Sequence, residues 1–381
     1  MKINYDNRIF GLDIMRAAAI LMVVFSHTLW ILLPRTKNLV TEVLSLSGLL
    51  GVEIFFVLSG FLIGRIIYNT FVNGDFTIKK VGYFWIRRWF RTLPNYYLIL
   101  IVNIGLVIYF KASLPENIVS YFFFLQNFST EMPGFFVESW SLPIEEFAYI
   151  IGPLLLYLIM FLRLPLKRKY LFGIITLLII VCFMVNKVFY NINNEVKDMN
   201  YWNVNLKAVT IYRIDAVYYG VLAAWVSILI PKIWKKYRYF LFLLGLFILA
   251  SLNFVIPSQK IFIENHSFFW DVLYLPINSL VFVMCLPLLS SINSAPKLLL
   301  IPITYISIIS YSMYLLHYSV VMQLLQYYFT TEGLVGIQLY AYLFVYLMLT
   351  FISSYLLYRF FEKPFMDLRD KSFFLKRFKA N

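Results

Sequence analysis

The stretch RAAAILMVVFSH, residues 16–27, places an arginine and a histidine at the two ends of an otherwise apolar segment. The apolar residues continue on both sides, so that residues 12–33 form a run long enough to cross a lipid bilayer as a helix. An ionisable side chain inside a bilayer costs free energy and is usually paired or functional. The segment therefore predicts a membrane helix in which Arg16 and His27 each have a specific task.

The composition extends this interpretation to the whole chain. Of its 381 residues, 61% are hydrophobic and 14% are charged, whereas an average soluble domain has roughly 45–50% and about 25%. Apolar runs of membrane-spanning length recur at residues 12–33, 43–68, 93–110, 142–162, 170–189, 208–230, 237–255, 269–291, 304–328 and 338–361. We therefore expect an all-α bundle of about ten transmembrane helices. It would form one domain over residues 1–381, with a core at 8–365 and a basic tail at 366–381.

The charges of the loops predict the orientation of the bundle. If the N-terminus is inside the cell, 23 of the 33 Lys and Arg residues fall in inner segments and seven in outer segments, while Arg16, Arg65 and Arg213 lie within helices. Positive charge gathers on the cytoplasmic side of membrane proteins, so we expect both termini inside. The net charge of +14 then reflects topology and the anionic inner leaflet, and no nucleic-acid partner is expected.

The remaining composition narrows the class of protein further. Cys182 and Cys285 both lie in predicted spans, so neither a disulfide framework nor a metal site is expected. We expect a multi-pass protein of the cytoplasmic membrane, which is the inner membrane in a Gram-negative source.

Helical geometry relates Arg16 to His27. Eleven residues at 100° each come within about 20° of a whole number of turns and advance about 16 Å along the axis. Both side chains are therefore predicted on one helix face, and Asp13 is placed to pair with Arg16 near the inner surface. Counting from the helix ends puts further polar side chains at the level of His27, in the outer half of the bilayer. They are Glu53, Glu145, Arg213, Asp215, Asp271 and His317.

These residue types predict acid–base chemistry. A neutral histidine near a carboxylate is the usual arrangement of a general base, because the carboxylate fixes the tautomer and stabilises the imidazolium. His27 is therefore a candidate base for removing a hydroxyl proton during acyl transfer. A structural role stays open for several of the others, because polar side chains also link membrane helices. His317 and Asp271 could each be such a link, and Glu53 with Arg213 could form a structural ion pair.

A basic and aromatic segment lies on the predicted inner side. FWIRRWFRTLPNYY, residues 84–97, places Arg87, Arg88 and Arg91 beside tryptophan and phenylalanine. Guanidinium groups bind phosphates in a bidentate manner, and aromatic rings can stack on a nucleotide base. The segment favours a site for a phosphate-bearing nucleotide, although the positive-inside rule alone also places arginines here.

Taken together, seven segments in order resemble acyltransferase family 3, the integral-membrane enzymes that O-acylate sugars and other extracytoplasmic molecules. They are RAAAILMVVFSH, GVEIFFVLSGFLIG, RRWFRTLP, ESWSLPIEEFAYI, RIDAVYYG, SYSMYLLH and FFEKP, spanning roughly residues 8–365. The chain departs from the family at Glu53, where many members have aspartate, and at Ala148, where an aromatic residue is usual. It resembles the stand-alone type, without a fused extracytoplasmic hydrolase-like domain.

The resemblance implies an O-acyltransferase that uses cytosolic acyl-CoA, acetyl-CoA by default, as co-substrate and has no tightly bound cofactor. The acceptor would be a hydroxyl of an extracytoplasmic glycan or lipid-linked sugar. Lipopolysaccharide O-antigen, exopolysaccharide, peptidoglycan and a small metabolite fit the residues equally well. The residues likewise do not indicate the length of the acyl group, whether a covalent acyl-enzyme forms, whether a partner protein is needed, or the oligomeric state.

The resemblance also suggests roles for individual side chains. Arg87, Arg88 and Arg91 would hold the nucleotide phosphates, and Arg16 would lie beside the pantetheine arm. His27 would act as the general base, with Glu53 and Glu145 orienting it. The groups expected to stabilise the oxyanion or line the substrate site are Arg213, Ser59, a backbone amide near Gly60, and His317.

Two other functions compete with acyl transfer. A polysaccharide or small-molecule transporter would also have ten helices with intramembrane charges, but we find no internal repeat, and a transporter does not need the basic and aromatic segment. A non-catalytic assembly partner is the second alternative, for which the loss of His27 would be silent.

Overall fold

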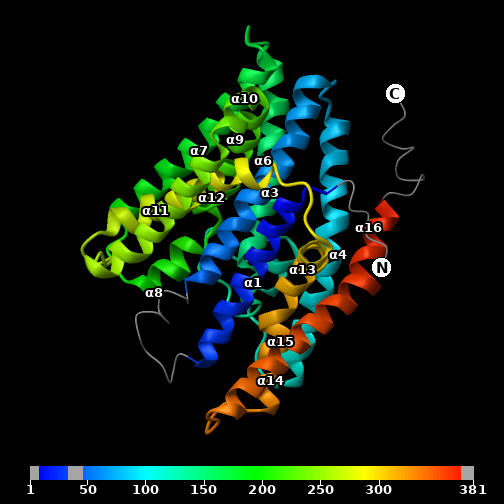
Figure 1. Cartoon of the computed structure of the whole chain (residues 1–381), viewed down its shortest axis with the longest axis vertical. Coiled ribbons are helices and arrows are strands. Elements are labelled where there is room, and N and C mark those ends of the chain that lie inside the picture. The colour runs from blue at the N-terminus through cyan, green and yellow to red at the C-terminus, as the bar shows by residue number, and fades with distance from the viewer. Residues whose placement is uncertain (1–7, 33–45, 370–381) are drawn as a thin grey trace.

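The computed structural model describes residues 8–32 and 46–369. Every regular element in this part of the chain is a helix, which confirms the predicted all-α class (Figure 1). Nine helices within the described residues are long and apolar enough to cross a membrane, and α9 is a shorter apolar helix. The predicted tail from residue 370 onward and the first residues of the second predicted span, 43–45, lie outside the described residues.

The ten predicted spans correspond to ten long helices. They are α1 Phe10–Leu32, α3 Ser47–Asn73, α4 Ile78–Tyr109, α6 Ser141–Ile159, α7 Arg168–Asn193, α9 Ile214–Leu229, α11 Arg238–Ser258, α12 Tyr274–Leu289, α13 Lys297–Leu316 and α15 Ile337–Leu357. The shorter helices are α5 Ile118–Phe122, α8 Met199–Trp202, α10 Pro231–Lys236, α14 Gln323–Tyr328 and α16 Lys363–Arg369. Single turns of other helix types are η2 Val137–Trp140, η3 Met160–Leu162, η4 Asn203–Lys207, η5 Thr210–Tyr212, η6 Phe269–Leu273, η7 His317–Met322 and η8 Tyr358–Glu362.

The largest difference from the predicted spans concerns α4. The apolar run predicted a span over 93–110, but the helix begins at Ile78, where the Thr77 side chain caps it by accepting a hydrogen bond from the Lys80 amide. The basic and aromatic segment is therefore helical. Arg88 and Arg91 lie about 15 and 20 Å along the helix from its first residue, deep in the bundle rather than at its inner surface.

Helix α3 lies at the centre of the bundle (Figure 1), and 72% of its most apolar 18-residue stretch is buried. Small residues bring α3 against α9: a Cβ added at Gly60 would overlap the backbone carbonyl of Val217, and one at Gly220 would overlap that of Val57. Such close backbone approach is typical of membrane helices that pack through glycine. It fixes the position of every side chain that α3 presents to the site.

Helix α11 lies at the edge of the bundle (Figure 1). Only 6% of its most apolar 18-residue stretch is buried inside the bundle. Its exposed side chains include Leu243, Phe247 and Phe254. A helix that is apolar on its exposed faces is expected to contact lipid. This arrangement agrees with a polytopic membrane protein.

Backbone hydrogen bonds join two irregular segments at the end of the bundle that the loop charges predict to be outside. Residues 123–140 and residues 199–213 together form what we call the outer cap. The Met132 amide donates to the Val204 carbonyl over 2.9 Å, and the Thr210 amide donates to the Asn127 carbonyl over 2.9 Å. The outer cap therefore fixes η2 and η4 relative to one another.

Candidate active site

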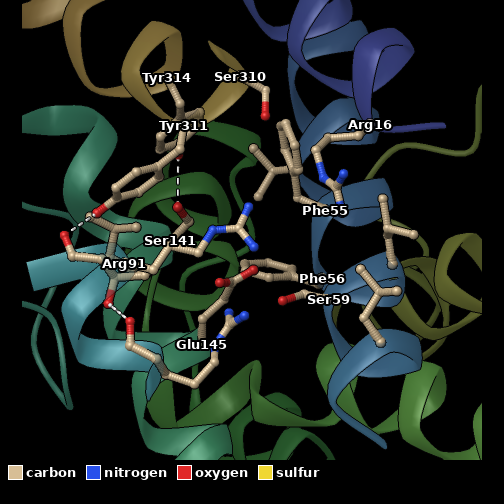
Figure 2. Close-up of a pocket in the computed structure, with 16 residues that line it drawn as sticks. Arg16, Phe55, Phe56, Ser59, Arg91, Ser141, Glu145, Ser310, Tyr311 and Tyr314 are labelled. Carbon is tan, nitrogen blue, oxygen red and sulfur yellow. Dashed lines mark hydrogen bonds between the residues drawn. The ribbon is translucent and has the colours of Figure 1, made fainter. Parts of the chain in front are cut away.

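A cavity lies inside the bundle among α1, α3, α4, α6 and α13 (Figure 2). It holds about 780 Å³ of empty space, part of it open to solvent. Its polar lining consists of Arg16, Ser59, Arg88, Arg91, Thr92, Ser141, Glu145, Ser310, Tyr311 and Tyr314. Three guanidinium groups face one carboxylate in this lining, so the cavity suits an anionic ligand.

Arg16 enters the cavity from α1, on the side opposite Arg91 (Figure 2). Its Nη1 lies 3.4 Å from Asp13 Oδ1, which confirms the predicted pair, and donates to Ser307 Oγ over 3.1 Å. Asp13 also binds Arg8, whose Nε lies 2.7 Å from Asp13 Oδ2. One carboxylate thus serves two arginines, which leaves net positive charge beside the cavity.

Tyr149 joins three helices by binding side chains that line the cavity. Arg88 Nη2 donates to the Tyr149 hydroxyl over 2.8 Å, and the guanidinium lies 4.4 Å from the centre of the Tyr149 ring. The same hydroxyl donates to Glu145 Oε2 over 2.7 Å and is hydrogen-bonded to Ser59 Oγ. Tyr149 was not among the predicted site residues, although it directly follows Ala148 in the segment ESWSLPIEEFAYI and is aromatic.

Glu145 therefore lies with Arg88 and Ser59, among the arginines of the cavity. The prediction put it at the level of His27 because the apolar run was taken to begin at residue 142. The membrane-spanning stretch actually begins with η2 at Val137, so Glu145 lies eight residues, about 12 Å, from the start of that stretch.

Two of the three arginines in the basic segment reach the cavity. Arg88 and Arg91 are three residues apart and share a helix face, and both line the cavity. Arg87 points elsewhere: it is exposed, and its Nη1 donates to the Tyr83 hydroxyl over 3.2 Å. The predicted trio of Arg87, Arg88 and Arg91 therefore does not meet in one place, and the arginines that line the cavity are Arg16, Arg88 and Arg91.

His27 contacts a second histidine, His317. Nδ1 of His27 lies 2.9 Å from the Val23 carbonyl and 3.3 Å from Nε2 of His317. Nδ1 of His317 lies 2.7 Å from the Tyr314 carbonyl. Because a carbonyl can only accept, both Nδ1 atoms carry hydrogen, as assigned from these partners. His317 Nε2 then accepts from His27 Nδ1–H, and Nε2 of His27 is the nitrogen that can take up a proton.

The predicted common face of Arg16 and His27 is confirmed by these contacts. Arg16 binds Ser307, and His27 binds His317, which lies ten residues further along the continuous helix α13–η7. The two ends of the quoted stretch therefore contact the same neighbouring helix at two depths.

Glu53 has partners other than the one predicted for it. It forms a fully buried ion pair with Arg213 and accepts a hydrogen bond from Ser279 Oγ over 2.9 Å. These contacts tie α3 to α9 and α12, which agrees with the structural alternative for Glu53 and Arg213. Neither residue lines the cavity, and the side chain from another helix that meets His27 Nδ1 is His317, beside the Val23 carbonyl and the Ser26 hydroxyl of α1 itself. Counting depth along each helix had given the level of these residues but not the direction in which they point.

The other predicted acidic residues of the outer half also form pairs with α7. Asp215 binds Lys187, and Asp271 accepts from Asn191 Nδ2 over 2.8 Å. Asp271 lies 3.2 Å from Lys197 Nζ as well. These contacts support the linking role that was open for Asp271.

One aromatic ring separates the cavity from the histidine pair. Tyr314 lines the cavity, and its ring centre lies 5.8 Å from that of His317. The Tyr314 hydroxyl is 2.8 Å from Ser141 Oγ and donates to the Glu138 carbonyl over 2.9 Å. Phe55 packs edge-on against the same ring at 6.2 Å. The arginine cavity and the histidine pair are thus neighbouring parts of one site.

This site and fold agree with the comparison to known families. Residues 9–359 match the family model of acyltransferase family 3, described as an acyltransferase domain. The match covers almost the whole chain, and the chain belongs to this family.

The individual relatives are similar to this chain only at a low level of sequence identity. Over 377 residues the chain is 28% identical to a Staphylococcus aureus (strain COL) protein provisionally named an O-acetyltransferase, covering 93% of this chain and 57% of that protein. It is 31% identical over 207 residues to YrhL of Bacillus subtilis (strain 168), provisionally named a peptidoglycan O-acetyltransferase, covering 50% and 30%. It is 32% identical over 145 residues to the peptidoglycan O-acetyltransferase OatA of Listeria monocytogenes, covering 34% and 22%. The chain thus spans little more than half the length of the first relative. No solved structure matches it at a significant level.

Proposed function

We propose that this chain transfers an acyl group, acetyl in the simplest case, from cytosolic acyl-CoA to a hydroxyl of an extracytoplasmic glycan. The observation that carries the proposal is the order of the two polar sites along α1 and α13–η7. The arginine cavity comes first and the histidine pair second, with Tyr314 between them. The names of the relatives, all O-acetyltransferases, support the same activity.

The cavity is suited to the phosphate end of the donor. Arg16, Arg88 and Arg91 supply three guanidinium groups, and each can bind a phosphate in a bidentate manner. Coenzyme A carries its phosphates at one end and its thioester at the other, on a flexible arm. Since Arg16 and His27 are about 16 Å apart along α1, phosphates held at the arginines would direct the thioester past Tyr314 toward His27.

The histidine pair is suited to general-base catalysis. Nε2 of His27 would take the proton of the acceptor hydroxyl while the hydroxyl oxygen attacks the thioester carbonyl carbon. Collapse of the tetrahedral intermediate would break the carbon–sulfur bond, and the departing thiolate would take the proton back from Nε2. The Val23 carbonyl and His317 hold Nδ1–H in place and would stabilise the imidazolium, the role predicted for Glu53 and Glu145.

The acceptor would reach His27 from the outer cap. Two relatives are named for peptidoglycan, so a cell-wall glycan is the first acceptor to test. We also place the chain in the cytoplasmic membrane, where cytosolic donor and external acceptor are both accessible.

The test is transfer by the purified full chain in detergent. Radiolabelled acetyl-CoA and a peptidoglycan fraction are mixed, and labelled glycan is counted after separation. A transporter would show no transfer, because detergent abolishes any gradient, whereas the proposed enzyme gives time-dependent labelling. Mass spectra of envelope glycans from cells with and without the gene would then identify acyl group and acceptor by one shift in mass.

A further inference from the structure

Lys207 is a half-buried cation of the outer cap that has no part in the acyl transfer proposed above. Its Nζ lies 4.9 Å from the centre of the Trp140 ring. Among the described residues it forms no ion pair with a carboxylate. A sequestered charge costs free energy unless an opposite charge compensates it, and the aromatic face compensates it only in part.

The position of Lys207 is fixed by a buried amide. Asn127 is fully buried, and its Nδ2 donates both to the Trp140 carbonyl over 2.8 Å and to the Ala208 carbonyl. One side chain therefore holds η2 and the end of η4 together. Lys207 and Trp140 face each other because of this link.

The ammonium group lies close enough to His27 for its charge to act on the imidazole. Burial lowers the pKa of Lys207 to about 8, so the group still carries its charge for most of the time at neutral pH. A positive charge therefore lies in the outer cap, within electrostatic range of His27 and on the side from which the acceptor would approach.

We propose that Lys207, backed by Trp140, binds an anionic substituent of the acceptor, a carboxylate or a phosphate, and so places the acceptor hydroxyl beside His27. The proposal rests on the proposed acyl transfer for the identity of the ligand as the acceptor. The anion site itself rests only on the charge, the burial and the aromatic partner of Lys207. Lys207 is then a specificity-determining residue that selects acidic glycans over neutral ones.

A binding experiment tests the anion site without any catalysis. The full chain in detergent, with CoA added to fill the arginine cavity, is titrated with glucuronate, with inorganic phosphate or with neutral glucose while tryptophan fluorescence is followed. Glucuronate or phosphate is expected to change the emission because Trp140 borders the site, and glucose is not. The anion that binds more tightly identifies the chemistry of the substituent.

Three variants separate the site from general effects. Lys207→Met keeps the length of the side chain and removes its charge, so anion binding should weaken about tenfold or more. Lys207→Arg should retain binding, and Lys260→Met, at an exposed lysine, should leave it unchanged. The proposal would be overturned if Lys207→Met bound glucuronate and phosphate as tightly as wild type does. It would also be overturned if wild type bound glucose as tightly as it binds the two anions.

Kinetics then separate acceptor binding from a direct role in the reaction. With an acidic acceptor, Lys207→Met should raise KM for the acceptor about tenfold and leave kcat nearly unchanged. A fall in kcat with unchanged KM would assign Lys207 to the oxyanion and contradict the acceptor site. The two proposals can fail separately. If neither wild type nor any variant transfers acyl groups, the proposed function is wrong. The anion site is still supported in that case if anion binding depends on Lys207.

Discussion

At the scale of single residues, the tautomer of His27 decides what the site can do. Two acceptors, the Val23 carbonyl and His317 Nε2, lie within hydrogen-bonding distance of its Nδ1. A ring held in this way has Nε2 as its basic nitrogen and cannot rotate without losing these contacts. In the proposed mechanism a neutral histidine, His317, would take the place of the carboxylate that usually supports a catalytic histidine.

Removing the imidazole should abolish transfer without preventing donor binding. We expect His27→Ala to reduce kcat by about 10²–10⁴-fold, the usual contribution of general acid–base catalysis. The dissociation constant for CoA should stay within about twofold of wild type, because His27 does not line the arginine cavity. Full activity of His27→Ala would refute the general-base role.

The neighbouring arginines of α4 provide a matched pair of substitutions. Arg91→Ala removes a guanidinium from the cavity, so acyl-CoA should bind about tenfold more weakly, given that a hydrogen bond between charged groups contributes about 1.5–3 kcal/mol. Arg87→Ala removes an equal charge from an exposed position and should leave CoA affinity unchanged. The check is equilibrium binding of radiolabelled CoA; equal losses in both variants would show that charge alone, not the cavity, attracts the donor.

At the scale of helices, the buried pair of Glu53 and Arg213 fastens α3 to α9. Both side chains have no exposed surface, so neither charge has water to replace a lost partner. The pair and the glycine contact at Gly60 hold the same two helices together. Ser59, which binds Tyr149 in the cavity, depends on that contact for its position.

Breaking this pair should destabilise the fold. Glu53→Gln leaves the Arg213 charge buried without its partner, which typically costs about 3–5 kcal/mol. The melting temperature in detergent should fall clearly, and the double variant Glu53→Leu with Arg213→Met should recover part of the loss because it removes both charges. An unchanged melting temperature together with lost transfer would instead assign Glu53 a direct role in the reaction, as the sequence first suggested.

Much of the helical arrangement could be predicted from hydropathy alone, since each long apolar run must become a helix in lipid. The common face of Arg16 and His27 could also be predicted, because both lie on one helix with a known twist. Pairings between helices could not. Glu53 and Arg213 are 160 residues apart, and nothing in either segment tells which way it faces. Helical arithmetic could not have separated Arg87 from Arg91, because four residues advance by about 400° and place the two only about 40° apart on α4.

At the scale of the whole molecule, the arrangement requires access from both sides of the membrane. The arginine cavity and the histidine pair lie at different depths of one bundle, and the proposed function requires the cell interior to lie on the arginine side. The predicted orientation, with both termini inside, meets this requirement.

Reporter fusions check the orientation. A fluorescent protein fused after Asn381 should fold and fluoresce, and alkaline phosphatase at the same position should stay inactive, because it folds only outside the cytoplasm. The same phosphatase inserted between Glu264 and His266, in a predicted outer loop, should be active. The opposite pattern would place the arginine cavity on the outer side and exclude a cytosolic donor.

The Tyr314 ring has a consequence for the membrane itself. A polar cavity next to a pair of histidines inside one bundle could conduct protons across the membrane. A cell that depends on its proton gradient cannot tolerate such a leak. Because the hydroxyl of Tyr314 is held by Ser141 and the Glu138 carbonyl, we expect its ring to restrict the movement of protons between the cavity and the histidine pair. Proteoliposomes containing Tyr314→Ala should lose an imposed pH gradient faster than those containing wild type, and equal decay would show that the bilayer is sealed elsewhere. The residue that lets the thioester pass would thus also have to keep protons from following it.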